Sequence, residues 1–147
     1  MNYTHETSRG ACSANCQARD MEFVALYNDT LKLMIDRGVA APRREAIRFT
    51  IHNGHPRYHV SYKRAYAVVC QLINHGKMSS NPSLSAQMWV ELTNRVEALC
   101  RNTGLSIARA VEFVLQHCRA TRFYISEAHA DSILDRARRQ YRQQKLK

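Results

Sequence analysis

The chain has 147 residues, of which 45% are hydrophobic, and this is enough to form a folded core. Its formal net charge of +10 at neutral pH indicates an anionic partner and says little about the fold. The sequence contains no run of about 18 apolar residues that could span a membrane, and its polar N-terminus lacks the apolar stretch of a secretory signal. We therefore expect a folded cytoplasmic protein without a membrane partner.

The N-terminal half of the chain predicts a polar arm followed by one helical unit. Residues 1–19 are rich in polar and small side chains, which predicts a flexible arm. Beyond them, apolar residues at helical spacing, interrupted by Gly and Pro, predict a first helical unit over residues 20–76. Ser61 is well placed to cap the last helix of this unit. The predicted elements are helices over residues 21–36, 43–51 and 62–74 and an extended segment over residues 57–61.

The C-terminal half repeats this plan after a linker. Residues 77–84 are rich in Ser and contain a proline, and they separate the two units. The second helical unit covers residues 85–147, with Ser106 and Ser126 as expected N-caps. No series of alternating strands is present, so the pattern predicts an all-α fold. The predicted elements are helices over residues 85–102, 107–117 and 127–143 and an extended segment over residues 122–126.

The two halves also resemble each other residue by residue. Residues 46–69 read AIRFTIHNGHPRYHVSYKRAYAVV, and residues 110–134 read AVEFVLQHCRATRFYISEAHADSIL. Phe49 aligns with Phe113 and, after a slip of one residue, Ser61 aligns with Ser126. A repeated unit of roughly 65 residues usually packs as a pseudo-symmetric pair. We therefore expect two tandem three-helix units related by internal duplication, with Phe49 and Phe113 in equivalent buried sites.

Each repeat contains an Arg-aromatic-x-Val/Ile-Ser segment, at residues 57–61 and again at residues 122–126. With this pair of segments, the chain resembles a group of small uncharacterised bacterial and phage proteins over about residues 43–137. The group has no established activity, so the resemblance implies no site residues.

The same segments are also similar, more weakly, to helix-turn-helix DNA-binding proteins. In that motif two consecutive helices pack together and the second helix presents its outer face to the major groove. Pro56 interrupts the first helix of the motif, and the apolar positions suit the core of a helical bundle equally well. A second similarity, to ribbon-helix-helix repressors over residues 85–115, lacks the strand that reads DNA. The apolar positions of the helix-turn-helix motif are Ala120, Phe123, Ile125, Ala130 and Ile133.

Positive charge is concentrated at the end of the chain, where six Lys or Arg and no acid occur from Arg136 onward. Such residues contact nucleic-acid phosphates, and these contacts position a ligand without specifying its sequence. The sequence therefore predicts a nucleic-acid-binding protein, DNA ahead of RNA, that serves as a regulator or accessory factor of a mobile element or phage. The expected contacts are Arg57, Lys63, Arg64, Arg122, Arg136, Arg138, Arg139 and Arg142.

The alternative is a helical protein–protein adaptor or a phage-related structural protein, with a homodimer also open. An exposed apolar patch beside Trp89 or Tyr141 would favour it. No glycine-rich phosphate loop, nucleophile elbow or carboxylate pair in an apolar pattern is present, so we expect no enzyme and no cofactor. Cys12 and Cys16 lack a second pair of ligands, which predicts no metal site, and the cysteines are expected to be reduced.

Overall fold

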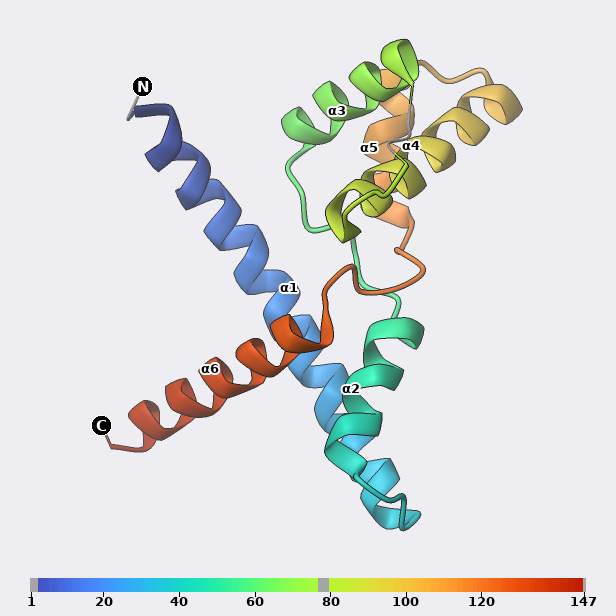
Figure 1. The fold of residues 1–147 in the computed structure, drawn as a ribbon. Coiled ribbons are helices and arrows are strands. Elements are labelled where there is room, and N and C mark those ends of the chain that lie inside the picture. The colour runs from blue at the N-terminus through green and yellow to red at the C-terminus, as the bar shows by residue number, and fades with distance from the viewer. Residues whose placement is uncertain (1–2, 77–79, 147) are drawn as a thin grey trace. The chain divides into compact units, whose positions relative to one another are not determined.

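The computed structural model describes the backbone of residues 3–76 and 80–146, with side chains from Ala14 onward (Figure 1). This part of the chain forms six helices and no strand, which confirms the predicted all-α fold. The predicted linker over residues 77–84 lies partly outside the described residues. The helices are α1 (Tyr3–Asp36), α2 (Pro42–Asn53), α3 (Tyr62–His75), α4 (Leu84–Thr103), α5 (Ile107–His117) and α6 (Glu127–Lys145).

Local signals place the ends of these helices close to the predicted positions. The three expected serine caps are confirmed, because the side chains of Ser61, Ser106 and Ser126 each accept a hydrogen bond from a backbone N–H three residues on. Gly104 ends α4 in the left-handed conformation, with φ of 74°, that glycine adopts without strain. The structure differs at the start of the chain, where the predicted arm is part of α1. No proline interrupts residues 3–20, so no backbone N–H needed for the helix is missing there.

The helices form two compact units, and each unit draws on separated parts of the chain. The α3/α4/α5 unit contains Arg57–Ala120, together with the chain up to Ala18. The α1/α2/α6 unit contains Arg19–Pro56 and Thr121–Lys147. The packed trios are therefore not the consecutive trios expected from the sequence. Because α2 and α3 belong to different units, as do α5 and α6, neither pair shares one core as a helix-turn-helix requires.

The core of the α3/α4/α5 unit is built from one buried stripe on each helix. Trp89, Leu92 and Val96 of α4, whose helical spacing predicts an inward stripe, are buried against the buried faces of α3 and α5. The extended segments at the ends of this unit meet in a single antiparallel bridge between Arg57 and Arg119. The other buried apolar residues of this unit are Tyr58, Ala65, Val69, Ala110, Val111, Val114 and Ala120.

The core of the α1/α2/α6 unit is centred on Phe123, which is 1% exposed although it lies outside any helix. Its ring packs edge-on against Phe23 of α1, with centroids 5.2 Å apart. Its backbone N–H donates to the carbonyl oxygen of Ile51 at 2.8 Å, which fixes the segment against the end of α2. A Cβ at Gly54 would lie 2.6 Å from the Phe123 ring, so this position requires glycine.

Three predicted core positions are wrong. Phe49 is 51% exposed and Phe113 is 44% exposed, because the buried faces of α2 and α5 lie on other sides of these helices. Phe113 instead contacts the ring of His117 on the surface, at 4.7 Å between centroids. Tyr141, which the helical spacing Ala130, Ile133, Leu134, Ala137, Tyr141 predicts to point inward, is 59% exposed because α6 buries no side chain after Leu134.

Candidate nucleic-acid interface

The first half of α6 is acidic, and helix α2 neutralises it. Arg43 of α2 forms ion pairs with Asp131 at 3.2 Å and with Asp135 at 3.6 Å. Arg48, also on α2, donates to the Glu127 carboxylate at 2.9 Å. These pairs are exposed and so contribute little stability, but they compensate the acids of α6 within their own unit.

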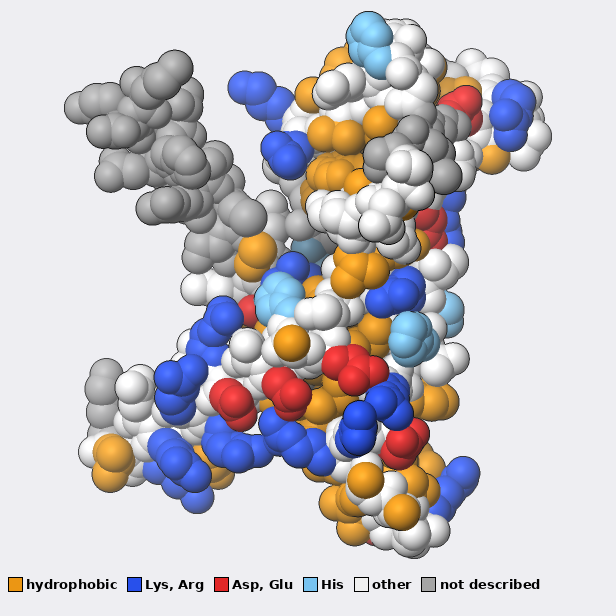
Figure 2. Space-filling view, in the orientation of Figure 1, with side chains coloured by type: hydrophobic (Ala, Val, Ile, Leu, Met, Phe, Trp, Pro, Cys, Tyr) orange, Lys and Arg blue, Asp and Glu red, His pale blue; other side chains and the backbone are white. Residues whose placement is uncertain are grey.

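The second half of α6 is basic, and from Arg138 onward it is exposed on every side. Arg138, Arg139 and Arg142 are exposed, and no ion pair with any of them is found among the residues that the structure describes. Arg138 and Arg142 are four residues apart and so share one face of the helix. Figure 2 shows basic side chains along α6, with acidic ones confined to its first part. These three residues, which the sequence predicts as nucleic-acid contacts, are thus exposed and without a described ion pair, and their role as contacts stays a prediction.

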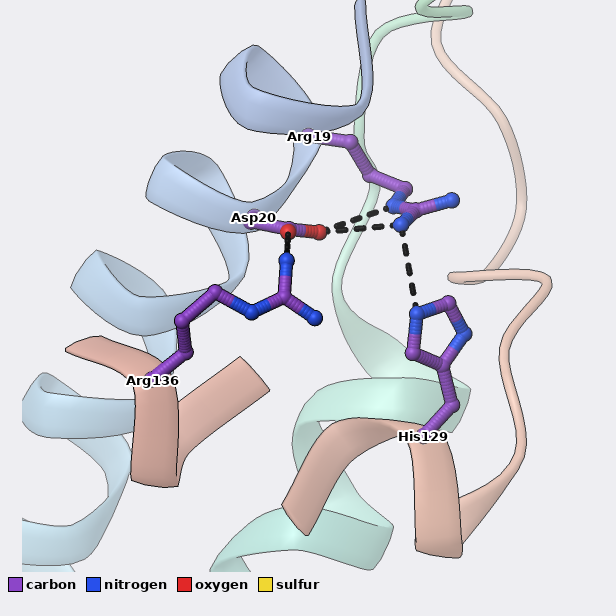
Figure 3. A network of polar contacts seen from close by, with 4 residues as sticks. All are labelled: Arg19, Asp20, His129 and Arg136. Carbon is purple, nitrogen blue, oxygen red and sulfur yellow. Dashed lines mark hydrogen bonds and ion pairs between the residues drawn. The ribbon is translucent and has the colours of Figure 1, made fainter. Parts of the chain in front are cut away.

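Arg136 has a different environment from the three arginines that follow it. Its guanidinium lies 3.5 Å from the Asp20 carboxylate of α1, whose side chain is only 15% exposed (Figure 3). Arg19 holds the same carboxylate at 2.9 Å. Arg136 therefore ties α6 to α1 inside the α1/α2/α6 unit, and its charge is partly compensated there.

His129 completes this cluster from the first turn of α6. Its Nε2 lies 3.4 Å from the Arg19 guanidinium (Figure 3). Burial lowers the pKa of His129, the nearby Arg19 and Arg136 lower it further, and Asp20 opposes them. The imidazole is consequently neutral at neutral pH and adds no positive charge to the surface.

The remaining predicted contacts are spread over both units. Lys63 and Arg64 are exposed in the first turn of α3, and the Arg64 guanidinium lies 5.7 Å from the centre of the buried Trp89 ring. Arg57 is exposed at the bridge to Arg119. Arg122 is half-buried, donates to the carbonyl oxygen of Phe123 at 3.0 Å and covers the Tyr124 ring. Arg122 thus holds its own segment in place.

Exposed tyrosines lie among the basic residues and were not predicted as site residues. Tyr62 and Tyr66 are 45% and 41% exposed beside Lys63 and Arg64, and Tyr141 lies between Arg138 and Arg142. The Lys145 ammonium is 5.0 Å from the centre of the Tyr141 ring. The sequence does carry a signal for the first pair, because no Asp or Glu occurs from residue 46 to residue 90 around two tyrosines one helical turn apart.

Other kinds of site find less support. Within the part of the chain that the structure describes, no group of three His, Cys, Asp or Glu side chains could hold a metal ion. The described cysteines, Cys16, Cys70, Cys100 and Cys118, are not in disulfides, whereas the side chain of Cys12 lies outside the described residues. None of the described helices is long and apolar enough to cross a membrane.

Comparison with protein-family models, with curated proteins and with solved structures finds no match to this chain. The resemblances proposed from the sequence therefore stay expectations. The surface chemistry of the two units is what supports a function.

Proposed function

We propose that the protein binds nucleic acid, with DNA as the expected ligand, and acts as a regulator or accessory factor of a mobile element or phage. The observation that carries the proposal is the exposure and uniformly positive charge of the second half of α6. After Leu134 the helix continues to Lys145 without a buried side chain, and every charged residue past Asp135 is basic.

Apart from the ion pair of Arg136 with Asp20, the fold gives this stretch no structural reason to be so basic. Cations near a helix C-terminus interact favourably with the helix dipole, but that effect is confined to about the last turn. Here the basic residues extend over about three turns, and their mutual repulsion opposes the helix. A polyanion removes that repulsion, and each phosphate contact releases counterions.

The predicted phosphate contacts divide into strong and weak candidates according to whether each side chain is exposed or already engaged within its own unit. Arg138 and Arg142 share one face of α6 with Arg139 beside it, so one phosphate backbone can contact all three. An exposed α-helix also has the width that the major groove of DNA accepts. Lys63 and Arg64 form a second exposed set on α3, while Arg122 and Arg136 serve their own unit.

The proposed internal duplication has support from aligned buried positions. Tyr58 and Phe123 are 5% and 1% exposed, and Ala65 and Ala130 are both 0% exposed. Helices α3 and α6, which are aligned in sequence, each pack with the first two helices of the other half. We infer that the two halves descend from one unit that exchanged its third helix with its copy.

An adaptor function has one specific observation in its favour. Leu33 and Ile35 near the end of α1 are 51% and 57% exposed, and Val39 in the following loop is 36% exposed. Exposed apolar side chains this close in sequence are a feature of protein-binding surfaces. This end of the α1/α2/α6 unit, at α1–α2, is the place where a protein partner is expected.

Duplex DNA binding as a function of salt tests the proposal. The full chain is expected to bind a duplex at low ionic strength, with affinity that falls steeply as salt rises. R138Q/R139Q/R142Q is expected to weaken binding to all sequences alike and to reduce the log–log salt slope by about two to three.

K32Q/R37Q/R44Q is the matched control, because it removes the same charge from exposed residues elsewhere in the same unit. An equal loss in the control would mean that only net charge matters. Absence of any binding at low salt would reject the nucleic-acid function in favour of the adaptor.

A further inference from the structure

Two exposed tyrosines form a parallel pair at the start of α3. Tyr62 and Tyr66 are 45% and 41% exposed, and they lie one helical turn apart. Their ring centroids are 6.2 Å apart, and their planes are inclined by only 15°. Buried apolar contacts of the α3/α4/α5 unit come from other positions of α3, Ala65 and Val69. The pair is therefore not needed to form the core.

A hydrogen bond from Tyr62 and the stacking of the two rings on each other keep the pair in place. The Tyr62 hydroxyl donates to the carbonyl oxygen of Ala108 on α5 at 3.2 Å. A hydrogen bond to Cys70 is the first cause that raises the pKa of Tyr66, followed by the charge of Cys70, so this phenol stays neutral. Rings that are already ordered lose little conformational entropy when a flat ligand binds them.

The surroundings of the pair are basic. No Asp or Glu occurs from residue 46 to residue 90, which includes all of α3. Lys63 lies on the helix surface next to Tyr66, three residues before it, and Arg109 is exposed at the start of α5. The acid of α5 is Glu112, which is exposed one turn after Ala108. The charge around the two rings thus favours an anionic ligand.

We propose that the Tyr62–Tyr66 pair binds unpaired bases of a single-stranded nucleic acid, with Lys63 and Arg109 contacting the adjacent phosphates. The inference rests on the proposed nucleic-acid function and gives it a second site with a different preference. Bases stack on aromatic rings only where they are not already paired and stacked in a duplex. Duplex phosphates are the ligand of α6, whereas the tyrosine pair selects strands with accessible base faces.

The test measures binding of the full chain to a fluorescent single strand of about 15 nucleotides and to a duplex of the same length. Y62A/Y66A is expected to weaken single-strand binding by about 5- to 150-fold, the range that loss of one stacked base produces. Duplex binding is expected to stay unchanged in this variant. R138Q/R139Q/R142Q is expected to show the opposite preference, with the larger loss on the duplex.

Two matched variants separate base stacking from other roles of the rings. Y62F/Y66F keeps both rings and is expected to retain most of the single-strand affinity. Y62L/Y66L keeps apolar bulk without a π face and is expected to bind as weakly as the alanine variant. E112Q removes the nearby acid and is expected to strengthen single-strand binding about two- to fivefold, since one like-charge contact is relieved. Far-UV circular dichroism of each variant checks that the helices remain.

The possible outcomes distinguish this inference from the function on which it rests. Duplex binding without single-strand binding, or single-strand binding that Y62A/Y66A leaves intact, would overturn the inference alone. Single-strand affinity retained by Y62L/Y66L would show that base stacking on the rings is not what binds the strand, and would overturn the inference. Binding to neither nucleic acid would reject both proposals. If the alanine and leucine variants lose their helices, an abasic strand of the same length, which keeps the phosphates and lacks the bases, decides the result with the original chain, because equal affinity for both strands would overturn the inference.

Discussion

Helices α3 and α6 occupy aligned positions in the two halves of the sequence, yet they present different surfaces. Both follow an Arg-aromatic-x-Val/Ile-Ser segment, and both begin with a serine cap. The first turn of α3 has no acid and carries exposed Tyr62, Lys63 and Arg64. The first half of α6 is acidic and bound to arginines of α2, and only its second half is basic. The shared residues set the local fold, whereas the residues that differ set the chemistry of each surface.

Truncation of the aromatic residue before each helix tests the structural half of this comparison with the largest expected effect. Phe123→Ala is expected to lower the free energy of unfolding by about 3–5 kcal/mol, because the ring is fully buried between α1 and α2. Its aligned partner Tyr58 is 5% exposed, so Tyr58→Ala is expected to have a comparable effect in the other unit. Urea unfolding followed by circular dichroism measures both.

Phe113→Ala is the control for these two variants, because Phe113 is 44% exposed. It is expected to change the free energy of unfolding by less than about 1 kcal/mol. A loss at Phe113 as large as that at Phe123 would mean that exposure does not separate the two kinds of aromatic position.

Removal of the serine caps gives a smaller and more symmetric effect. Ser61→Ala and Ser126→Ala each leave a backbone N–H of the first turn without its partner, at Arg64 and at His129. Each is expected to cost about 0.5–2 kcal/mol, measured by thermal or urea unfolding. Ser→Asp at the same positions keeps an acceptor and should retain the stability. A loss at only one of the two serines would break the equivalence of α3 and α6.

The smallest expected effect is a pH dependence confined to α6, which α3 lacks because it has no equivalent of His129. The pKa of His129 is lowered in the folded state, so the unfolded chain binds the proton more readily. The resulting stability is fully present above the ordinary histidine pKa of about 6.5, and it decreases as pH falls from there through the lowered pKa. Protonated His129 would face the guanidinium groups of Arg19 and Arg136, with Asp20 as the compensating acid.

Unfolding measured between about pH 7 and pH 5 checks this effect, since the ordinary pKa values of Asp and Glu lie below that range. His129→Gln is expected to flatten the dependence. His75→Gln in α3 should leave it unchanged, because His75 is exposed. A steeper dependence in His129→Gln than in the original chain would contradict the sign of the pKa change.

Local features of this protein follow from the sequence because they depend on neighbours within about one helical turn. Apolar spacing, glycines and serine caps predict five of the six helices to within two residues at most of their ends, and the charge pattern predicts the basic end of α6. Helix α1 is the exception, because it begins at Tyr3 and the prediction began it at residue 21. The polar composition of residues 1–19 suggested that start, but no proline marks it.

The pairing of the helices depends instead on which apolar faces fit together across long stretches of chain. The two similar halves offer nearly the same stripe on α3 and α6, and the sequence does not show that each packs with the other half. Because they depend on this helix pairing, three further features are not predicted by the sequence. They are the exposure of Phe49 and Phe113, the ion pair of Arg136 with Asp20, and the hydrogen bond from Tyr62 to Ala108. Each of these depends on a helix distant in the sequence, and only the packed structure brings that helix into contact.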